Sequence, residues 1–280
     1  IDINKYKVTN FNSPLHWGQK YEPVSTMYYE FINNTKVDEF GCIPHSSYPF
    51  IAASPDGIIC DETSELFGRM LEIKNVVSRE ITGIPKMEYW IQMQIQMEVC
   101  NLNECDFLET KFLEYTDYEE FINDNNVKYK GIMLLYLNKN NDPLYEYAPF
   151  NIIDICSSEY LEWYNKINKN AIEKEYIFEK NIYWKLDKIS CILILRNKLW
   201  FSSVLSNINS FWENLLYERE TEKYKERIKK KRKLEIEDSK SKSDFPNSGC
   251  LIDLNDNQKI NTIDNSTNNY TDNFIINVIT

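Results

Sequence analysis

The sequence predicts an α/β layer fold, in which a small mixed central sheet is flanked by helices and followed by further helices toward the C-terminus. Two observations predict it. Short apolar runs bounded by turn residues are typical of strands, and they alternate with segments whose apolar residues recur at helical spacing. The chain has 280 residues, enough for one large domain or two small ones, and 42% of them are hydrophobic, enough for a core.

The first helix is expected to begin at Ser13-Pro14, because serine is a good N-cap and proline fits the first helical position. On one face, Gly18 and Glu22 lie four residues apart, so the small residue leaves room beside the carboxylate. Pro23 is a defect in this helix and is expected to kink it. An apolar stripe at helical spacing would face the core: Trp17, Tyr21, Val24, Tyr28 and Phe31.

The next part of the chain, up to about residue 150, is expected to supply the sheet. The polar stretch 61–64, with Gly68 beyond it, suits a hairpin turn between two of its strands. The expected elements are strands over 50–53, 57–60 and 70–74, a helix over 86–100, a strand over 106–115, a short helix over 118–122 and a strand over 131–138.

After Pro149 the chain is expected to be mainly helical, with helices over 157–179 and 198–217. Residues 191–195 between them are either a strand or a buried helical turn. From residue 219 to 233 the sequence is strongly basic, and beyond that it has little apolar content, which predicts a disordered tail. The expected organisation is one domain over 1–233, with a core at about 14–150 and a helical elaboration at about 151–233, and a polar tail over 234–280.

Composition narrows the class of protein. The seven cysteines are odd in number, scattered and never in a C-x-x-C pair, as expected of reduced thiols in an intracellular protein. With only two histidines, a zinc site and a histidine-dependent hydrolase have few candidate residues. No apolar run approaches the roughly 20 residues of a membrane span, and the N-terminus is unlike a signal peptide, so we expect no membrane partner.

Chemistry is expected where Ser54-Pro55-Asp56-Gly57 precedes Glu72-Ile73-Lys74 on a second strand. The carboxylates of Asp56 and Glu72, with the carbonyl of Ile73, would form the hard oxygen site that Mg²⁺ prefers. Lys74 shares a face with Glu72, because side chains two apart on a strand point the same way. A metal and a cation held against one phosphodiester are typical of a nuclease, in which Lys74 would orient the attacking water or stabilise the pentacovalent phosphate.

Two further polar side chains could complete this site. Glu22, from the first helix, could fill a second metal position or polarise the water, and Gln92 could hold the water or Lys74. Each signal alone has a plainer interpretation, since a helical glutamate is often a solvated acid and a glutamine-rich turn is often polar surface. Their joint appearance in this order favours the active-site interpretation.

The motifs resemble those of the lambda-exonuclease and YqaJ-like viral recombinase family, within the PD-(D/E)xK nuclease superfamily. The resemblance is clear over about residues 14 to 150 and continues more loosely to about 217, through Tyr183-Trp184-Lys185-Leu186-Asp187-Lys188. The motifs that carry it are Trp17-Gly18-Gln19-Lys20-Tyr21-Glu22, Ser54-Pro55-Asp56-Gly57, Leu71-Glu72-Ile73-Lys74 and Tyr89-Trp90-Ile91-Gln92-Met93-Gln94.

The resemblance implies a restriction-endonuclease-like core and a Mg²⁺-dependent exonuclease, with Mn²⁺ as a substitute, that degrades linear duplex DNA from its 5′ end. The product would be a 3′ single-stranded tail for recombination or for replication and repair. It also implies a single-strand annealing protein as partner and a homo-oligomer, namely a trimer. By the resemblance, Asp56, Glu72 and the Ile73 carbonyl would bind metal. Lys74 would be the catalytic lysine, Glu22 the helix acid and Gln92 the active-site glutamine.

Other interpretations stay open at this point. The same site would serve an endonuclease or nickase, and the fold could also carry a non-catalytic DNA-binding or scaffold protein. The net charge of −11 argues weakly against nucleic acid as a partner. A basic run near the C-terminus could contact DNA or direct the protein to a host nucleus; it consists of Lys229, Lys230, Lys231, Arg232 and Lys233. If the protein is viral, a cytoplasmic viral factory is the alternative location.

Overall fold

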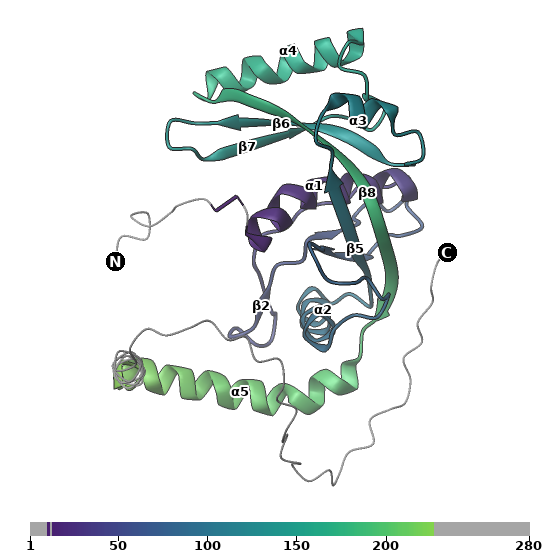
Figure 1. Ribbon diagram of the computed structural model, residues 1–280. Coiled ribbons are helices and arrows are strands. Elements are labelled where there is room, and N and C mark those ends of the chain that lie inside the picture. The colour runs from purple at the N-terminus through teal and green to yellow at the C-terminus, as the bar shows by residue number, and fades with distance from the viewer. Residues whose placement is uncertain (1–9, 12, 227–280) are drawn as a thin grey trace, which may run out of the picture. The chain divides into compact units, whose positions relative to one another are not determined.

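The computed structural model describes residues 10–11 and 13–226, which divide into one unit up to Phe201 and a second from Ser202 onward. Its elements follow one another along the chain as Figure 1 shows. They are α1 (Pro14–Asn33), β1 (Ile43–Pro44), β2 (Ala52–Ala53), β3 (Gly57–Ile58), β4 (Met70–Asn75), α2 (Met87–Cys100), β5 (Glu104–Glu114), α3 (Tyr118–Asn123), β6 (Lys130–Leu137), β7 (Pro143–Tyr147), α4 (Ser158–Glu173), β8 (Ile177–Leu195) and α5 (Lys198–Glu220).

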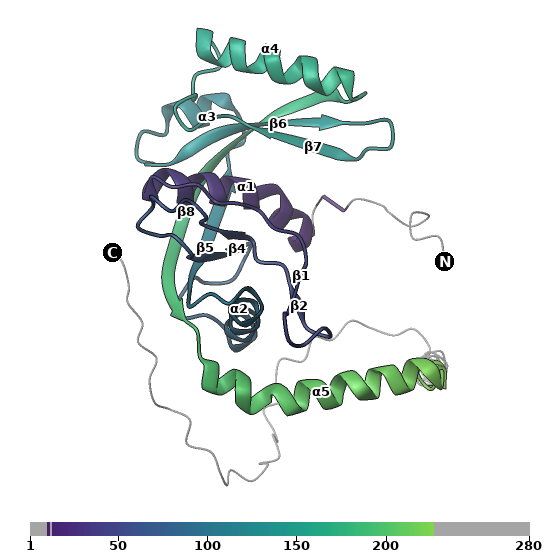
Figure 2. The ribbon, with the colours of Figure 1, turned by 180° about the vertical axis from the view of Figure 1, so that it is seen from behind.

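The first unit is built on a six-stranded sheet with the order β3-β4-β5-β8-β6-β7, beside a two-stranded sheet of β1 and β2. In the large sheet β4 and β5 run parallel, and every other neighbouring pair is antiparallel. The pairing of β5 with β8 shifts register between Lys111 and Phe112. A shift of this kind bends a strand and increases its twist, and both strands curl in Figures 1 and 2.

Helices cover both faces of this sheet. On one face α1 packs through Tyr21 against β6 and β8, and through Tyr29 against Leu108 of β5. On the other face Met97 of α2 packs against Phe107 of β5, and α4 lies over β6 and β8. Neighbours along a strand point to opposite faces, so Leu108 and Phe107 serve two different helices. The predicted α/β architecture, a mixed sheet flanked by helices, is confirmed.

The start of α1 follows the sequence signals closely. Ser13 caps the helix by accepting a hydrogen bond from the His16 backbone N–H at 3.1 Å, and Pro14 occupies the first helical position. Pro23 lies inside the helix, which nevertheless continues to Asn33 and ends where Asn34 takes up a left-handed conformation with φ of 48°.

Part of the helical prediction is wrong. The helix expected over 157–179 ends at Glu173, and the chain then forms β8, the longest strand, which lies between β5 and β6. Of the two interpretations of residues 191–195, the strand is therefore confirmed. Strand β8 contains several aromatic and β-branched residues, which favour strands. Its hydrogen-bonding partners are β5 and β6, which lie more than 30 residues earlier in the chain. Strands β1 and β7 were not predicted, and β2 and β3 are only two residues long.

Two expectations from composition can be compared with the structure. The six cysteines within the described part of the chain are all free thiols. Among all residues that the structure describes, no helix is long and apolar enough to cross a membrane.

Candidate active site

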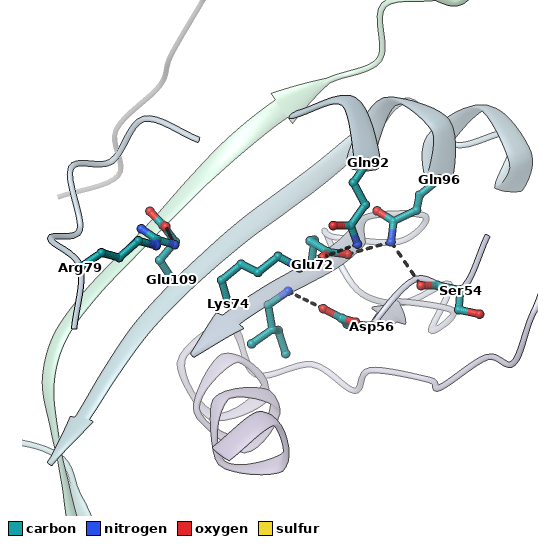
Figure 3. A network of polar contacts seen from close by, with 9 residues as sticks. Ser54, Asp56, Glu72, Lys74, Arg79, Gln92, Gln96 and Glu109 are labelled. Carbon is teal, nitrogen blue, oxygen red and sulfur yellow. Dashed lines mark hydrogen bonds and ion pairs between the residues drawn. The ribbon is translucent and has the colours of Figure 1, made fainter. Parts of the chain in front are cut away.

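The predicted site lies at the edge of the sheet where β3 meets β4, and Figure 3 shows its side chains. Gly57 of β3 pairs with Leu71 of β4 in an antiparallel register, so the residue before β3, Asp56, comes opposite Glu72. Gln92, one turn into α2, reaches the same point from the helix that covers this face. Residues from three separate segments are thus brought together.

The Asp56 side chain forms a hydrogen bond with the backbone of β4. Its Oδ2 accepts a hydrogen bond from the Ile73 N–H at 2.6 Å. Partial burial and the nearby carboxylate of Glu72 raise the pKa of Asp56 to about 7, although the Ile73 N–H stabilises the ionised form and opposes this shift. Metal-free Asp56 is therefore protonated in part near neutral pH.

Glu72 is fully buried and receives three donors. Its Oε1 accepts from the Lys74 ammonium, with which it forms an ion pair, and from Gln92 Nε2 at 2.7 Å. Its Oε2 accepts from Gln96 Nε2 at 2.8 Å. A buried carboxylate requires this degree of compensation, because an unpaired charge in the interior is strongly unfavourable.

Lys74 is the accessible member of the pair. Its side chain keeps 24% of its surface exposed, whereas Glu72 has none. Its ammonium lies 5.2 Å from the centre of the Tyr89 ring, and the Arg79 guanidinium lies 5.5 Å from the centre of the same ring. Arg79 in turn forms an ion pair with the buried Glu109, which pairs with Lys74 across β4 and β5. Two cations therefore adjoin one aromatic ring beside the acidic pair.

Glu22 is placed less directly. It is an exposed residue of α1, and no hydrogen bond of its carboxylate is found among the described residues. Its pKa is raised by partial removal from water and by the carboxylates of Glu39 and Glu72. Glu22 therefore interacts electrostatically with Asp56 and Glu72, but no hydrogen bond among the described residues joins it to them.

A buried polar network fixes α1 near the site. Asn75, at the end of β4, donates from Nδ2 to the Gly18 carbonyl at 3.0 Å. Its Oδ1 accepts from the hydroxyls of Ser25 at 2.7 Å and Thr110 at 2.8 Å. Asn75 thus ties the helix that carries Glu22 to the strand that carries Glu72.

The sequence did not predict roles for Gln96, Arg79 or Glu109. Gln96 has a usable signal, because it lies four residues after Gln92 and so on the same helical face. Glu109 has none, since only the pairing of β5 with β4 brings it beside Lys74. The basic run at residues 229–233 lies outside the described residues.

The oxygen donors fit a hard divalent cation. A search of the described residues found no group of three or more His, Cys, Asp and Glu side chains suited to a metal. The pair of Asp56 and Glu72 gains a further oxygen from the backbone, because a strand residue presents its N–H and C=O to the same side. The N–H of Ile73 points at Asp56, and its carbonyl therefore faces the same edge.

A separate pocket lies away from these residues. A pocket of about 500 Å³ adjoins the start of α1 and the β6–β7 hairpin, and none of the five predicted catalytic side chains lines it. Its wall includes Lys20, which forms an ion pair with Glu114, and the rings of Trp17 and Tyr145. Burial lowers the pKa of Lys20 despite that partner.

Residues 2–103 match the YqaJ-like viral recombinase domain, which confirms the resemblance predicted from the motifs. An uncharacterised protein of Acanthamoeba polyphaga mimivirus is 34% identical over 248 residues, which cover 75% of this chain and 44% of that protein. The chain thus spans less than half of the length of this relative.

Solved exonuclease structures are also similar, at a greater distance. An alkaline exonuclease of Laribacter hongkongensis, LHK-Exo, is 20% identical with a TM-score of 0.41, over 79% of this chain and 78% of that one. A phage-related exonuclease from Haemophilus somnus is 12% identical with a TM-score of 0.38, over 78% of each chain. Likenesses this distant assign no residue and no reaction to this chain.

Proposed function

We propose that this protein is a Mg²⁺-dependent deoxyribonuclease that digests linear duplex DNA from its 5′ ends. The observation that carries the proposal is the convergence of Asp56, Glu72 and Lys74, with Gln92 donating to Glu72 Oε1 at 2.7 Å. The match to a viral recombinase domain supports DNA as the substrate. The 5′-to-3′ direction and the 3′ single-stranded product rest on the motif resemblance.

Asp56, Glu72 and the Ile73 carbonyl would hold the cation. When bound, such an ion stabilises charge on the phosphate and lowers the pKa of a coordinated water. In its absence Lys74 supplies the positive charge at Glu72. A cation at Glu72 would replace that ammonium, and Lys74, which is the exposed partner, would then be available to the scissile phosphate.

Gln92 and Glu22 have different parts in this proposal. Gln92 keeps Glu72 oriented through its amide, so the carboxylate stays aimed at the edge of the sheet. Glu22 on α1 interacts electrostatically with the carboxylate of Glu72, and its raised pKa would make it a better acceptor for a proton from water than an ordinary glutamate.

The test is digestion of a linear 5′-phosphorylated duplex beside a covalently closed circle, with Mg²⁺ and with EDTA. The wild type should degrade the linear DNA alone and require Mg²⁺. Glu72→Ala should abolish the activity, and Lys74→Ala should lower turnover at least about 100-fold while retaining DNA binding, because it removes charge stabilisation from the transition state. The control is Glu62→Ala, because Glu62 is an exposed acid in the segment between β3 and β4.

Each other outcome has a defined meaning. Cutting of the circle would identify an endonuclease or nickase that uses the same residues. Full activity of Lys74→Ala would contradict the assignment of the site. DNA binding without cleavage of either substrate would favour the non-catalytic interpretation. An annealing partner and a trimer stay predictions from the resemblance, and a location in the nucleus or a viral factory stays a prediction from the sequence.

A further inference from the structure

A second glutamine of α2, outside the motif that carries the family resemblance, contacts the site. Gln96 lies one turn after Gln92 and is 3% exposed. Its Nε2 donates to Glu72 Oε2 at 2.8 Å and to the Ser54 carbonyl at 3.2 Å. Figure 3 shows its amide between these two groups. Both protons of one NH₂ group are therefore used, each on a different segment of the site.

These two acceptors determine how the amide is turned. A carboxylate oxygen and a backbone carbonyl can only accept, so the NH₂ group must face both of them. The remaining atom, Gln96 Oε1, is buried and finds no donor among the described residues. A buried acceptor without a partner is costly and calls for an explanation at that position.

The two bonds have a geometric consequence. Glu72 lies on β4, and Ser54 begins the turn that carries Asp56. Gln96 therefore connects the two segments that supply the carboxylates, and the Ile73 N–H connects them a second time through Asp56. Together with the pairing of β3 and β4, these two links constrain the separation of the carboxylates.

We infer that Gln96 is a positioning residue for a divalent cation, because it holds Glu72 at a set distance from the Asp56 turn. This inference rests on the proposed function, in which Asp56 and Glu72 bind the ion. Groups that orient the ligands of a metal typically contribute a factor of 10–100 to its affinity. Removal of the Gln96 amide should therefore weaken metal binding before any DNA is present.

Gln94 offers a matched control on the same helix. It is 1% exposed, and its amide also makes two hydrogen bonds, donating to the Leu195 carbonyl at 3.0 Å and accepting from the Asn197 N–H at 2.6 Å. These partners lie at the last residue of β8 and just after it, and neither belongs to the segments that carry Asp56 and Glu72. Gln94→Met and Gln96→Met thus lose the same number of bonds and the same amide, and only Gln96→Met alters the site.

The experiment measures Mn²⁺ binding to the full chain without DNA, by electron paramagnetic resonance of the free ion, for the wild type and both variants. Thermal unfolding in EDTA is measured in parallel. We expect both variants to lose thermal stability. The affinity for Mn²⁺ should fall about 10–100-fold in Gln96→Met and stay within about twofold of the wild type in Gln94→Met. Gln96→Asn, whose shorter amide cannot span both acceptors, should lose part of the affinity and covers the case in which Gln96→Met fails to fold.

The outcomes separate the two proposals. Unchanged Mn²⁺ affinity in the Gln96 variants, or an equal loss in Gln94→Met, would overturn the positioning role and leave the nuclease proposal intact. A wild type that binds no Mn²⁺, or binds it equally well as Asp56→Asn, would overturn the metal site on which the proposed function depends.

Discussion

At the scale of single residues, the candidate site is an arrangement of opposed charges. Glu72 is fully buried and compensated by Lys74 and two amides, whereas Asp56 accepts one hydrogen bond from the described residues, that of the Ile73 N–H. Burial and the charge of Glu72 raise the pKa of Asp56 to about 7, and the hydrogen bond from the Ile73 N–H only partly opposes this shift. A divalent cation would relieve the repulsion between the two carboxylates.

The raised pKa of Asp56 predicts how stability depends on pH without metal. The folded protein keeps a proton on Asp56 at pH values where the unfolded chain, with a pKa of 3.8, has released it. The associated stability is therefore complete below pH 4 and is lost as pH rises through about 7. Asp56→Asn, which can still accept from Ile73, should remove this loss and be more stable than the wild type at pH 8 by on the order of 2 kcal/mol.

Urea denaturation in EDTA at pH 5 and pH 8 checks this prediction. The two proteins should differ more at pH 8 than at pH 5, and Mg²⁺ should restore the wild type but not the variant. An equal difference at the two pH values would show that Asp56 titrates normally in the folded protein.

At the scale of elements, the Val37 side chain, which lies close to the backbone of Gly57, explains the glycine of Ser54-Pro55-Asp56-Gly57. A Cβ on Gly57 would lie 2.1 Å from Val37 Cγ1, while Ile58 exchanges two backbone hydrogen bonds with Asp38. The segment before β3 is thus pressed against a neighbouring chain segment, and Asp56 is held at its end. Gly18 of α1 differs, because a Cβ there meets nothing within 4 Å.

These two glycines give a paired prediction. Gly57→Ala should destabilise the protein by about 1–3 kcal/mol, the usual cost of overpacking, and should lower nuclease activity by shifting Asp56. Gly18→Ala should be neutral or stabilising by up to about 1 kcal/mol, because alanine is the better helix former. Urea denaturation measures the stability of the two variants, and digestion of linear DNA measures their nuclease activity. Equal stability of the two variants would contradict the close approach at Gly57.

At the scale of the whole molecule, the sheet depends on a strand from late in the chain. β8 pairs with β5 on one side and with β6 on the other, so it joins the half of the sheet that carries the site to the half formed by the β6–β7 hairpin. Trp184 of β8 is 2% exposed and packs in the same cluster as Tyr21 of α1. The helix that carries Glu22 is therefore supported from β8.

This arrangement predicts the effect of truncation. A chain that ends at residue 176 lacks β8, leaves β5 and β6 without a shared neighbour, and should fail to unfold cooperatively. A chain that ends at residue 226 keeps all six strands and should unfold in a single transition. Urea denaturation followed by near-ultraviolet circular dichroism distinguishes them, and a cooperative transition in the shorter chain would show that the site folds without β8.

Local signals in the sequence were sufficient for part of this structure. The N-cap at Ser13, the helical stripe through Tyr21 and the shared face of Glu72 and Lys74 depend on neighbours a few residues away, and each was predicted. The strand β8 was not, because its aromatic periodicity fits a helix as well and its strand partners lie far away in the sequence. The spacing places Gln96 on the same helical face as Gln92, but it does not specify the contact of Gln96 with Glu72.

The sequence by itself determined the fold class, the first helix and the motif residues from which a metal-dependent nuclease is proposed, because these follow from residue type, spacing and motif order. Only the tertiary structure decided that β8 lies at the centre of the sheet, that Gln96 and not Gln94 turns toward Glu72, and that Arg79 and Glu109 adjoin Lys74. The physical reason is that these contacts join residues that are distant along the chain, and the free energy of each depends on a partner that local spacing does not specify.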